Sequence, residues 1–362
     1  MATIAEQVIA NDPAFVRSPL AKYCVQNYLS EDALFNLVHF VPINVAVQNA
    51  TAFKYSYTIE NVDASSIDFR AIGGEYKKAN NIADSADVAL KILGGNFEVD
   101  EEFLYASTPG QGGLENYVDS QMRQKAAELV KAFNKFTIKG NATTDAKQFN
   151  GLEVLVPSSR TKSTAISCGD FSDAALRIAF TSLYSVLDAV PGANLIITTI
   201  EGVSAFRALL ATRNLSLSNS YVMTVASAAN NTPGIPVINF EGRVVVGLPR
   251  AYFSAAELEI GEPFYVLRSD ANKGFKFVTP AGRTPVVAKV PNLKEGNTTQ
   301  HQGGVSMHTA PVIEDLYACA KGYISAGSAN VTSLNNTTPR TAPEYTPATE
   351  DDSPSDSDLG GD

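Results

Sequence analysis

LENYVDSQMRQKAAELVKAFNKFTIKG, residues Leu114 to Gly140, is the stretch on which the fold prediction rests. Apolar side chains recur along it at spacings of three and four residues, which predicts one apolar face of an amphipathic helix. That face comprises Leu114, Val118, Met122, Ala126, Leu129, Phe133 and Phe136, widened by Tyr117 and Val130. Gly140 stands where a left-handed helix cap favours a residue without a Cβ atom. A helix of this length spans about 40 Å. It suits either a core helix of an ordinary α+β enzyme or a long helix that lies across a thin, shell-like protein.

The chain before this helix is predicted to form two paired strands. Phe53 to Ile59 (FKYSYTI) alternates aromatic or apolar with polar residues, which is the pattern of a half-buried strand. Val88 to Val99 (VALKILGGNFEV) is predicted to be the returning strand, with a β-bulge at Gly94-Gly95. The polar loop between them contains the core-sized residues Phe69, Ile72 and Tyr76. Because a long structureless loop is usually functional or disordered, and because these side chains are too many for a flexible linker, we expect the loop to pack on a surface outside its own domain.

The segments before the paired strands and after the long helix have weaker patterns. Residues 1–30 are predicted to be an extended arm, and a short apolar segment from Ala33 to Val41 ends at Pro42. After the long helix, residues 141–148 are a polar connection, and Phe149-Asn-Gly-Leu152 opens a strand predicted from Glu153 to Val156.

Beyond Pro157 helical and strand patterns alternate, which predicts an α/β domain. The expected elements are helices at 173–190 and 202–211, strands at 194–200, 263–268 and 275–278, a hairpin at 236–247 turning at Glu241-Gly242, a loop at 291–304, and a last ordered piece at 311–325. After Asn330 the composition is dominated by Ser, Thr, Pro, Asp and Gly, which predicts a disordered acidic tail.

The composition narrows the function classes. The 362-residue chain is 44% hydrophobic and has a net charge of −10, of which −6 lies from Pro339 onward. The folded part is therefore only mildly acidic. It has no basic stripe with interleaved aromatic residues, the pattern typical of a nucleic-acid-binding surface. No apolar run of about 18 residues occurs, and the N-terminus lacks the pattern of a secretory signal. We therefore expect neither a membrane span nor export.

Residues suited to catalysis or metal binding are scarce. Three cysteines, far apart and odd in number, are typical of reduced thiols: Cys24, Cys168 and Cys319. Three histidines lack partners at metal-ligand spacing, the first in an apolar run and the others in a predicted loop: His39, His301 and His308. Neither a nucleophile elbow nor a Walker-type phosphate loop occurs. We expect no cofactor, no metal and no enzymatic activity.

Taken in order, these pieces are similar to the major capsid protein of tailed bacteriophages, which has the HK-ninety-seven-type fold. The order is an arm, a strand, a long loop, a returning strand, a long helix, Phe149-Asn-Gly-Leu152 and an α/β domain. Phe69-Arg-Ala-Ile-Gly-Gly-Glu-Tyr76 falls where this family has an aromatic residue and a Gly-Glu element in its extended loop, the E-loop.

The resemblance implies an α+β fold with an N-terminal arm, an E-loop, a peripheral (P) domain with a long spine helix, and an α/β axial (A) domain. On this sequence the implied arm is 1–30, the E-loop 61–87 and the A domain 157–305. The implied P domain comprises 31–60, 88–156 and 306–335, with its spine helix at about 114–139, and 336–362 is the tail.

The resemblance also implies contacts between subunits. The E-loop residues expected to make them are Phe69, Arg70, Ile72, Glu75, Tyr76, Lys77 and Lys78. Some family members link an E-loop lysine covalently to an asparagine of a neighbour, and Lys77 and Lys78 lie in the matching region. Basic residues of the spine helix are expected on the inner surface, near DNA: Arg123, Lys131 and Lys135.

The implied function is that of a structural subunit that self-assembles, as hexamers and pentamers, into an icosahedral head around packaged double-stranded DNA. The implied partners are further copies of the chain, a separate scaffolding protein, the portal, a candidate decoration protein, and DNA through weak non-specific contacts. The implied location is the virion capsid, assembled in the cytoplasm of a bacterial host. Two alternatives stay open: an encapsulin-like protein compartment, and a cytoplasmic α+β enzyme.

Overall fold

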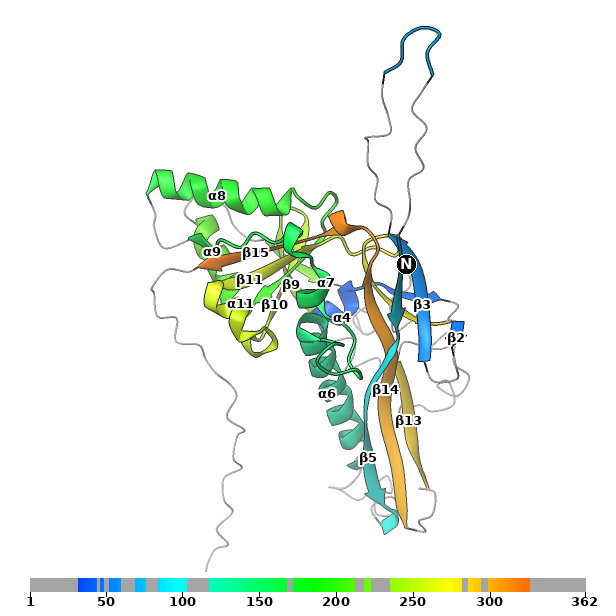
Figure 1. The fold of residues 1–362 in the computed structure, drawn as a ribbon. Helices are drawn as coiled ribbons and strands as arrows, with labels where there is room; N and C mark the ends of the chain where they lie inside the picture. The colour runs from blue at the N-terminus through cyan, green and yellow to red at the C-terminus, as the bar shows by residue number, and fades with distance from the viewer. Residues whose placement is uncertain are drawn as a thin grey trace, which may run out of the picture. The chain divides into compact units, whose positions relative to one another are not determined.

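The computed structural model describes residues 32–43, 46–48, 52–59, 69–75, 84–102, 117–167, 172–211, 218–222, 235–281, 286–293 and 299–325. All of them belong to one compact unit, Met1–Ala329 (Figure 1). The predicted arm and acidic tail lie outside the described residues, as do Tyr76, Lys77 and Lys78. The described part is α+β, with three sheets.

The first sheet has five strands and is built from distant parts of the chain. Its members are β1 (Phe40–Ile43), β12 (Phe275–Pro280), β14 (Gln300–Ile313), β13 (Val286–Leu293) and β5 (Lys91–Asp100). The long strand β14 is central, because it pairs antiparallel with β12, β13 and β5.

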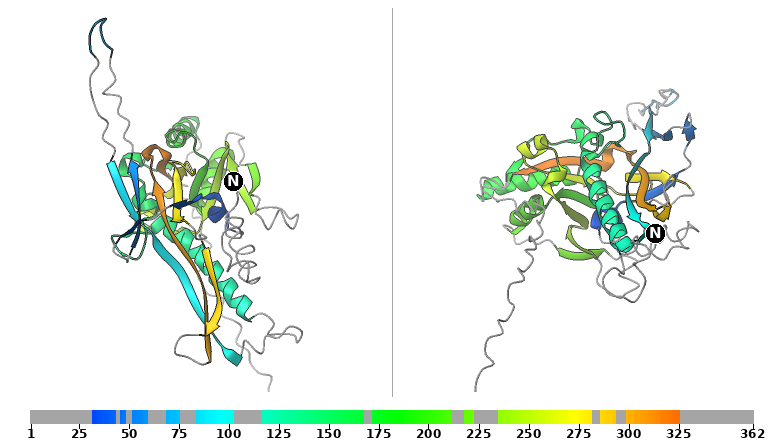
Figure 2. Two further views of the ribbon diagram at one scale, coloured as in Figure 1. Left: turned by 90° about the vertical axis from the view of Figure 1, so that its right-hand side faces the viewer. Right: turned by 90° about the horizontal axis from the view of Figure 1, so that it is seen from below.

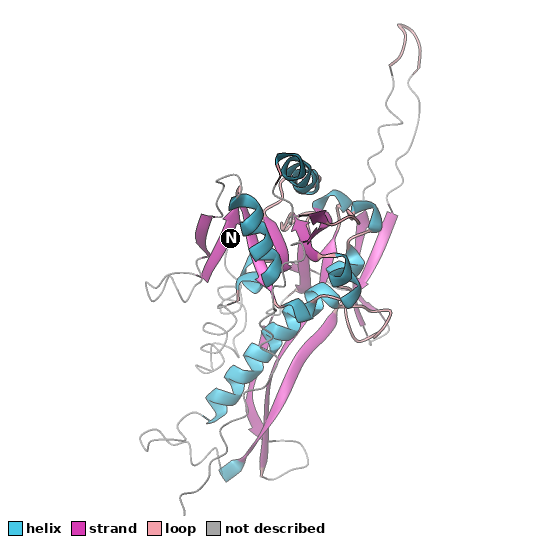
Figure 3. Ribbon diagram, turned by 90° about the vertical axis from the view of Figure 1, so that its left-hand side faces the viewer, coloured by secondary structure: helices cyan, strands magenta, loops and turns pink. Residues whose placement is uncertain are grey.

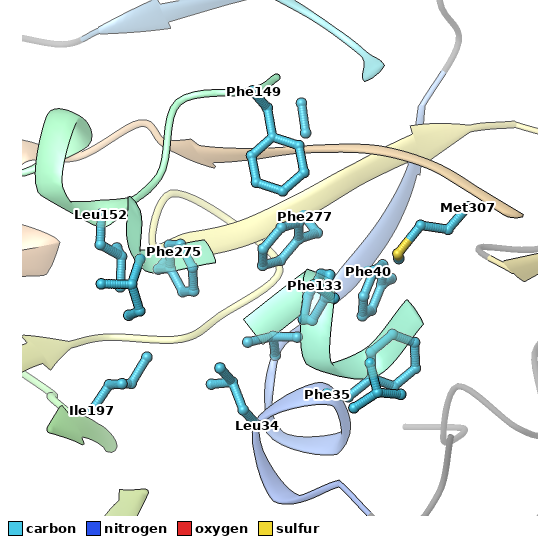
Figure 4. Packing of buried hydrophobic residues seen from close by; sticks show 14 of the residues in the cluster. Leu34, Phe35, Phe40, Phe133, Phe149, Leu152, Ile197, Phe275, Phe277 and Met307 are labelled. Carbon is cyan, nitrogen blue, oxygen red and sulfur yellow. The ribbon is translucent and has the colours of Figure 1, made fainter. Parts of the chain in front are cut away.

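Helix α6 (Tyr117–Lys139) packs on this sheet against β5 and β14 (Figure 3). Met122, Ala126 and Phe133 on its inner face are buried, which confirms the predicted apolar stripe over the described side chains. Phe133 lies among three other rings, with centroids 5.2 Å from Phe35 and 4.8 Å from Phe277 (Figure 4). Phe35 comes from the short helix α4 (Ala33–Leu37), which follows Asp32.

Gly140 ends α6 for a different reason from the one predicted. It is not among the residues with positive φ, so it is not a left-handed cap. Instead the Gly151 amide donates to the Gly140 carbonyl at 2.7 Å. A Cβ atom at Gly140 would come within 2.5 Å of the Phe149 carbonyl oxygen. The glycines therefore allow the turn after the helix to cross the helix end closely.

Several local predictions are wrong. Residues after Phe149-Asn-Gly form the single-turn helix α7 (Leu152–Leu155) and no strand. The pairing of β5 with β14 runs without a register shift, so Gly94-Gly95 is not a bulge in that ladder. The predicted loop at 291–304 contains the end of β13 and the start of β14. Short or glycine-containing segments have too few periodic apolar positions to distinguish a strand from a helical turn or a loop.

The second sheet has seven strands and follows the predicted α/β pattern closely. Its order is β6 (Ile166–Ser167), β15 (Cys319–Ser325), β11 (Glu262–Leu267), β7 (Leu195–Thr199), β10 (Arg243–Leu248), β9 (Ile235–Phe240) and β8 (Ser218–Val222). The β9–β10 hairpin turns at Glu241 (φ 49°) and Gly242 (φ 80°), as a two-residue turn with both central φ values positive requires.

In the described ranges, four further helices and three short 3₁₀ turns accompany these sheets, seen from other sides in Figure 2. They are α8 (Asp173–Leu187), α9 (Ile200–Ala211), α11 (Ala255–Ile260) and α7, with η3 (Ser158–Arg160), η4 (Arg250–Tyr252) and η5 (Leu316–Ala318). Helices α8 and α9 bury Leu183, Leu187 and Phe206 in a separate core under the seven-stranded sheet.

The strands divide between the two large sheets differently from the predicted domain bounds. Strands β12 and β13 and the first six residues of β14 lie within the predicted A domain but pair in the sheet under α6. Strand β15 was predicted in the P domain but pairs with β11. Which sheet a strand joins depends on partners far along the chain, and the strand's own periodicity does not encode them.

The third sheet is small and carries the segment predicted as the E-loop. It consists of β2 (Ala46–Gln48), β3 (Ala52–Ile59) and β4 (Asp84–Ala89), and β3 and β4 pair antiparallel from Lys54–Ala89 to Ile59–Asp84. The predicted strand at Phe53 to Ile59 is confirmed as part of β3, but its partner β4 begins at Asp84, inside the predicted loop. Of the predicted returning strand only Val88 and Ala89 pair with β3, and the part from Lys91 onward is β5, which pairs with β14.

Candidate assembly surfaces

Residues 69–75 are the described part of the predicted E-loop, and they are exposed. Phe69 is 103% exposed and Ile72 is 106% exposed. The segment turns at Gly73 (φ 84°), and the Gly74 amide donates to the Ala71 carbonyl at 3.0 Å. An apolar surface this open is typical of a contact site for another molecule.

The stem of this loop is fixed to the five-stranded sheet by aromatic side chains of β3. The Tyr55 hydroxyl donates to Glu314 Oε1 at 2.8 Å, and the Phe53 ring lies 5.0 Å from the His308 ring. Lys276 pairs with the same Glu314 at 2.7 Å. Burial, and the hydrogen bond to the Glu314 carboxylate, raise the pKa of Tyr55 to about 12. The hydroxyl therefore stays a donor, and the loop stem has a defined attachment.

The outer side of α6 carries lysines at a regular spacing. Lys131, Lys135 and Lys139 are exposed at successive turns, about 6 Å apart along the axis. Among the described residues none of the three has a carboxylate within ion-pair distance, whereas Lys125 pairs with Glu128 at 2.6 Å. Arg123, predicted with this group, is half-buried and does not lie on the exposed stripe.

A groove of about 610 Å³ opens beside the last turn of α6. Its lining includes Lys135, Lys139, Gln148, Glu153 and Val154. The mixed charge of these side chains gives the groove no clear preference for one kind of ligand.

A second exposed apolar site lies on η5, the 3₁₀ turn between β14 of the five-stranded sheet and β15 of the seven-stranded sheet. Leu316 is 45% exposed and Tyr317 is 63% exposed. The guanidinium carbon of Arg160 lies 5.0 Å from the centre of the Tyr317 ring. This site could not be predicted from the sequence, because a Leu-Tyr pair between two strands has no periodic signal that distinguishes an exposed turn from a core segment.

The most buried ionic group is structural. Glu257 of α11, 4% exposed, pairs with Lys321 of β15, 6% exposed, and accepts a hydrogen bond from the Tyr265 hydroxyl at 2.5 Å. Burial, together with the Glu257 charge, raises the pKa of Tyr265 well above its usual value. These contacts join α11, β11 and β15.

The titratable residues considered for catalysis are dispersed. His39 Nδ1 lies 3.1 Å from Ser269 Oγ, while His301 and His308 are on β14 and not in a loop. Cys319 is a buried free thiol, and Cys24 and Cys168 lie outside the described residues. Across the described ranges no group of three or more His, Cys, Asp or Glu is placed to hold a metal ion. In that same part of the chain, no helix is both long and apolar enough to span a membrane.

A long helix on a sheet, a paired-strand stem with an exposed loop, and an α/β layer together define the HK-ninety-seven-type capsid fold. No family model and no curated protein matches the sequence. Solved structures do match.

The SrpI encapsulin of Synechococcus elongatus is similar with a TM-score of 0.50 and 13% identity, over 81% of this chain and 87% of that one. The capsid of an empty GTA particle is similar with a TM-score of 0.50 and 12% identity, over 82% and 97%. The capsid of Myoviridae phage XM1 has a TM-score of 0.45 and 14% identity, over 79% and 89%. At these identities the two structures with TM-scores of 0.50 show the fold alone, which confirms the predicted fold class.

Proposed function

We propose that this chain is a major capsid protein, a structural subunit that self-assembles into the icosahedral head of a tailed phage. The observation that carries the proposal is the complete exposure of Phe69 and Ile72 on a loop whose stem is fixed to the body of a capsid-type fold. Burying such side chains is worth about 1.5–3 kcal/mol each. Many symmetric contacts of this kind would hold a shell together although each is weak.

Several finer features belong to the same proposal. The subunits form hexamers and pentamers, assembled in the bacterial cytoplasm with a separate scaffolding protein and a portal. Lys131 and Lys135 face the packaged DNA and make weak, salt-dependent phosphate contacts. Arg123, being half-buried, contributes less to that surface. The E-loop is the main contact between neighbours, and Lys77 and Lys78 are candidates for covalent links.

The E-loop assignment is tested by deleting residues 61–82, which removes the exposed segment and leaves the paired strands β3 and β4 in place. The variant is expected to stay soluble as a subunit and to form no closed shells in electron microscopy, because it lacks the contact made by Phe69 and Ile72. The matched control is Lys147→Ala, an exposed residue on the loop after α6. Normal particles from the deletion variant would refute the assignment.

A second candidate function is an encapsulin-like compartment that holds protein cargo. The SrpI encapsulin matches with the same TM-score as the GTA capsid, so the fold supports both. Particles purified from the native source separate the two: nuclease-protected DNA supports the phage head, and a protein cargo without DNA supports the compartment.

A further inference from the structure

We propose that the surface formed by Arg160, Lys162, Leu316 and Tyr317, here called the η5 surface, receives segment 69–75 of a neighbouring copy. This inference rests on the proposed shell function and goes beyond it, because it names the acceptor of the E-loop. The inference depends on three properties of the η5 surface and on the matching properties of the loop.

The apolar part of the η5 surface is held in place before any partner binds. Asp315 caps the turn, since its Oδ1 accepts from the Tyr317 amide at 2.8 Å. The same carboxylate accepts from Arg268 Nη2 at 2.9 Å. Leu316 and Tyr317 therefore stay exposed on a fixed turn, and little conformational entropy is lost when they are covered.

The basic part of the η5 surface is bonded to neutral groups only, among the described residues. Arg160 Nε donates to the Cys319 carbonyl at 3.1 Å and its Nη2 donates to the Ala189 carbonyl. Both acceptors are neutral, and no described carboxylate lies within ion-pair distance of Arg160. Lys162 Nζ lies 3.4 Å from the neutral Ser185 hydroxyl.

Both basic groups line one hollow of about 290 Å³, whose lining also includes three apolar residues and Lys321, the partner of Glu257. Arg160 and Lys162 line it together with Ser159, Thr161 and Ser185. Two cations and several hydroxyl groups around one hollow fit a carboxylate, because each can donate a hydrogen bond to its oxygens. The η5 surface thus combines an apolar patch with a carboxylate site.

Segment 69–75 has the complementary combination. Ile72 is fully exposed and Glu75 follows three residues later, also exposed. Three residues of extended chain span at most about 10 Å, and the Arg160 guanidinium lies 5.0 Å from the Tyr317 ring. Ile72 can therefore cover Leu316 and Tyr317 while Glu75 reaches the basic hollow. The Arg70 guanidinium turns back to its own loop, 3.3 Å from the Gly74 carbonyl.

The combination favours a protein segment over nucleic acid. A phosphate backbone would use the two cations but would leave Leu316 and Tyr317 uncovered. If Ile72 covers Leu316 and Tyr317, the exposed apolar surface of the loop and that of η5 are removed from water by the same contact.

Disulfide trapping tests the contact directly. In a Cys24→Ser, Cys168→Ser background, subunits carrying Ile72→Cys are assembled with subunits carrying Tyr317→Cys and oxidised. We expect a covalent dimer on non-reducing gels. The control pairs Ile72→Cys with Ile178→Cys, which is 69% exposed on α8, and should give at most a trace. Equal yields for the two pairs would overturn the proposal.

Charge exchange provides a second, independent test. Glu75→Lys and Lys162→Glu should each lower the yield of closed shells by about tenfold, since each places like charges together. The double variant should restore most of the yield, and Lys147→Glu should have no effect. If both single variants assemble at the wild-type yield, the η5 surface is not the acceptor, although the shell function stands. If the wild-type chain forms no shells either alone or together with the separate scaffolding protein, the proposed function fails and this inference fails with it.

Discussion

At the scale of single residues, the Glu257–Lys321 pair has the clearest energetic role. Both side chains are nearly inaccessible, and the Lys321 ammonium also lies 5.2 Å from the Tyr265 ring centre and 5.3 Å from that of Tyr323. Removing one partner leaves a buried charge without compensation, whereas replacing both removes the charges together.

We therefore predict that Lys321→Met lowers the free energy of unfolding by about 3–5 kcal/mol. The double variant Lys321→Met, Glu257→Leu should lose much less, because no charge is left buried. Chemical denaturation of the unassembled subunit measures both, with Lys147→Met as the exposed control expected within about 0.5 kcal/mol of wild type. Equal losses in the single and double variants would mean that the lysine contributes packing alone.

Cys319 gives a second prediction at this scale. Burial raises the pKa of its thiol to about 11, so almost no thiolate is present at neutral pH, and only the thiolate reacts. A thiol reagent should leave Cys319 unlabelled in the folded protein and label it fully in denaturant. Peptide mapping identifies the site, and rapid labelling of Cys319 in the native chain would contradict its placement at the start of β15.

At the scale of elements, the close crossing of Gly140 and Gly151 decides how α6 joins the next turn. A Cβ atom at Gly140 would lie 2.5 Å from the Phe149 carbonyl oxygen and 2.6 Å from the Phe136 carbonyl oxygen. Backbone atoms cannot yield as a flexible side chain can, so an added methyl group should be costly.

Gly140→Ala is predicted to destabilise the subunit by about 1–3 kcal/mol, the usual cost of overpacking. Gly95→Ala is the control, because the nearest atom to its added Cβ is Lys125 Cδ at 3.6 Å. Thermal unfolding compares the two variants. If Gly140→Ala loses no more stability than Gly95→Ala, the backbone crossing at Gly140 is less tight than in the structure.

Elements with strong local periodicity could be predicted from the sequence, and elements defined by distant partners could not. The stripe from Met122 to Phe133 repeats over several turns, and the β9–β10 hairpin has its turn residues in place. The sheet membership of β12, β13 and β15 depends on pairings with strands elsewhere in the chain.

The two candidate surfaces differ in the same respect, since one could be predicted from the sequence and the other could not. The sequence predicted the exposed loop, because Phe69 and Ile72 are conspicuous in a long polar segment. It did not predict the η5 surface, because Arg160 and Tyr317 are far apart in the chain and meet only in the fold.

At the scale of the whole molecule, two of the places where apolar side chains stay exposed are far apart in the sequence and each hold two such side chains. Phe69 and Ile72 lie on one site, and Leu316 and Tyr317 on the other. A contact between two different patches of one chain is heterologous, and such contacts generate rings when the rotation closes. Rings of this type are the building units of a closed shell.

Electron microscopy of the purified chain, expressed alone and concentrated, tests the shell assignment most directly. The account predicts large closed particles, or curved lattices, built from six- and five-membered rings of the subunit. A single small oligomer of fixed size, with no lattice or shell at any concentration either alone or with the separate scaffolding protein, would contradict it.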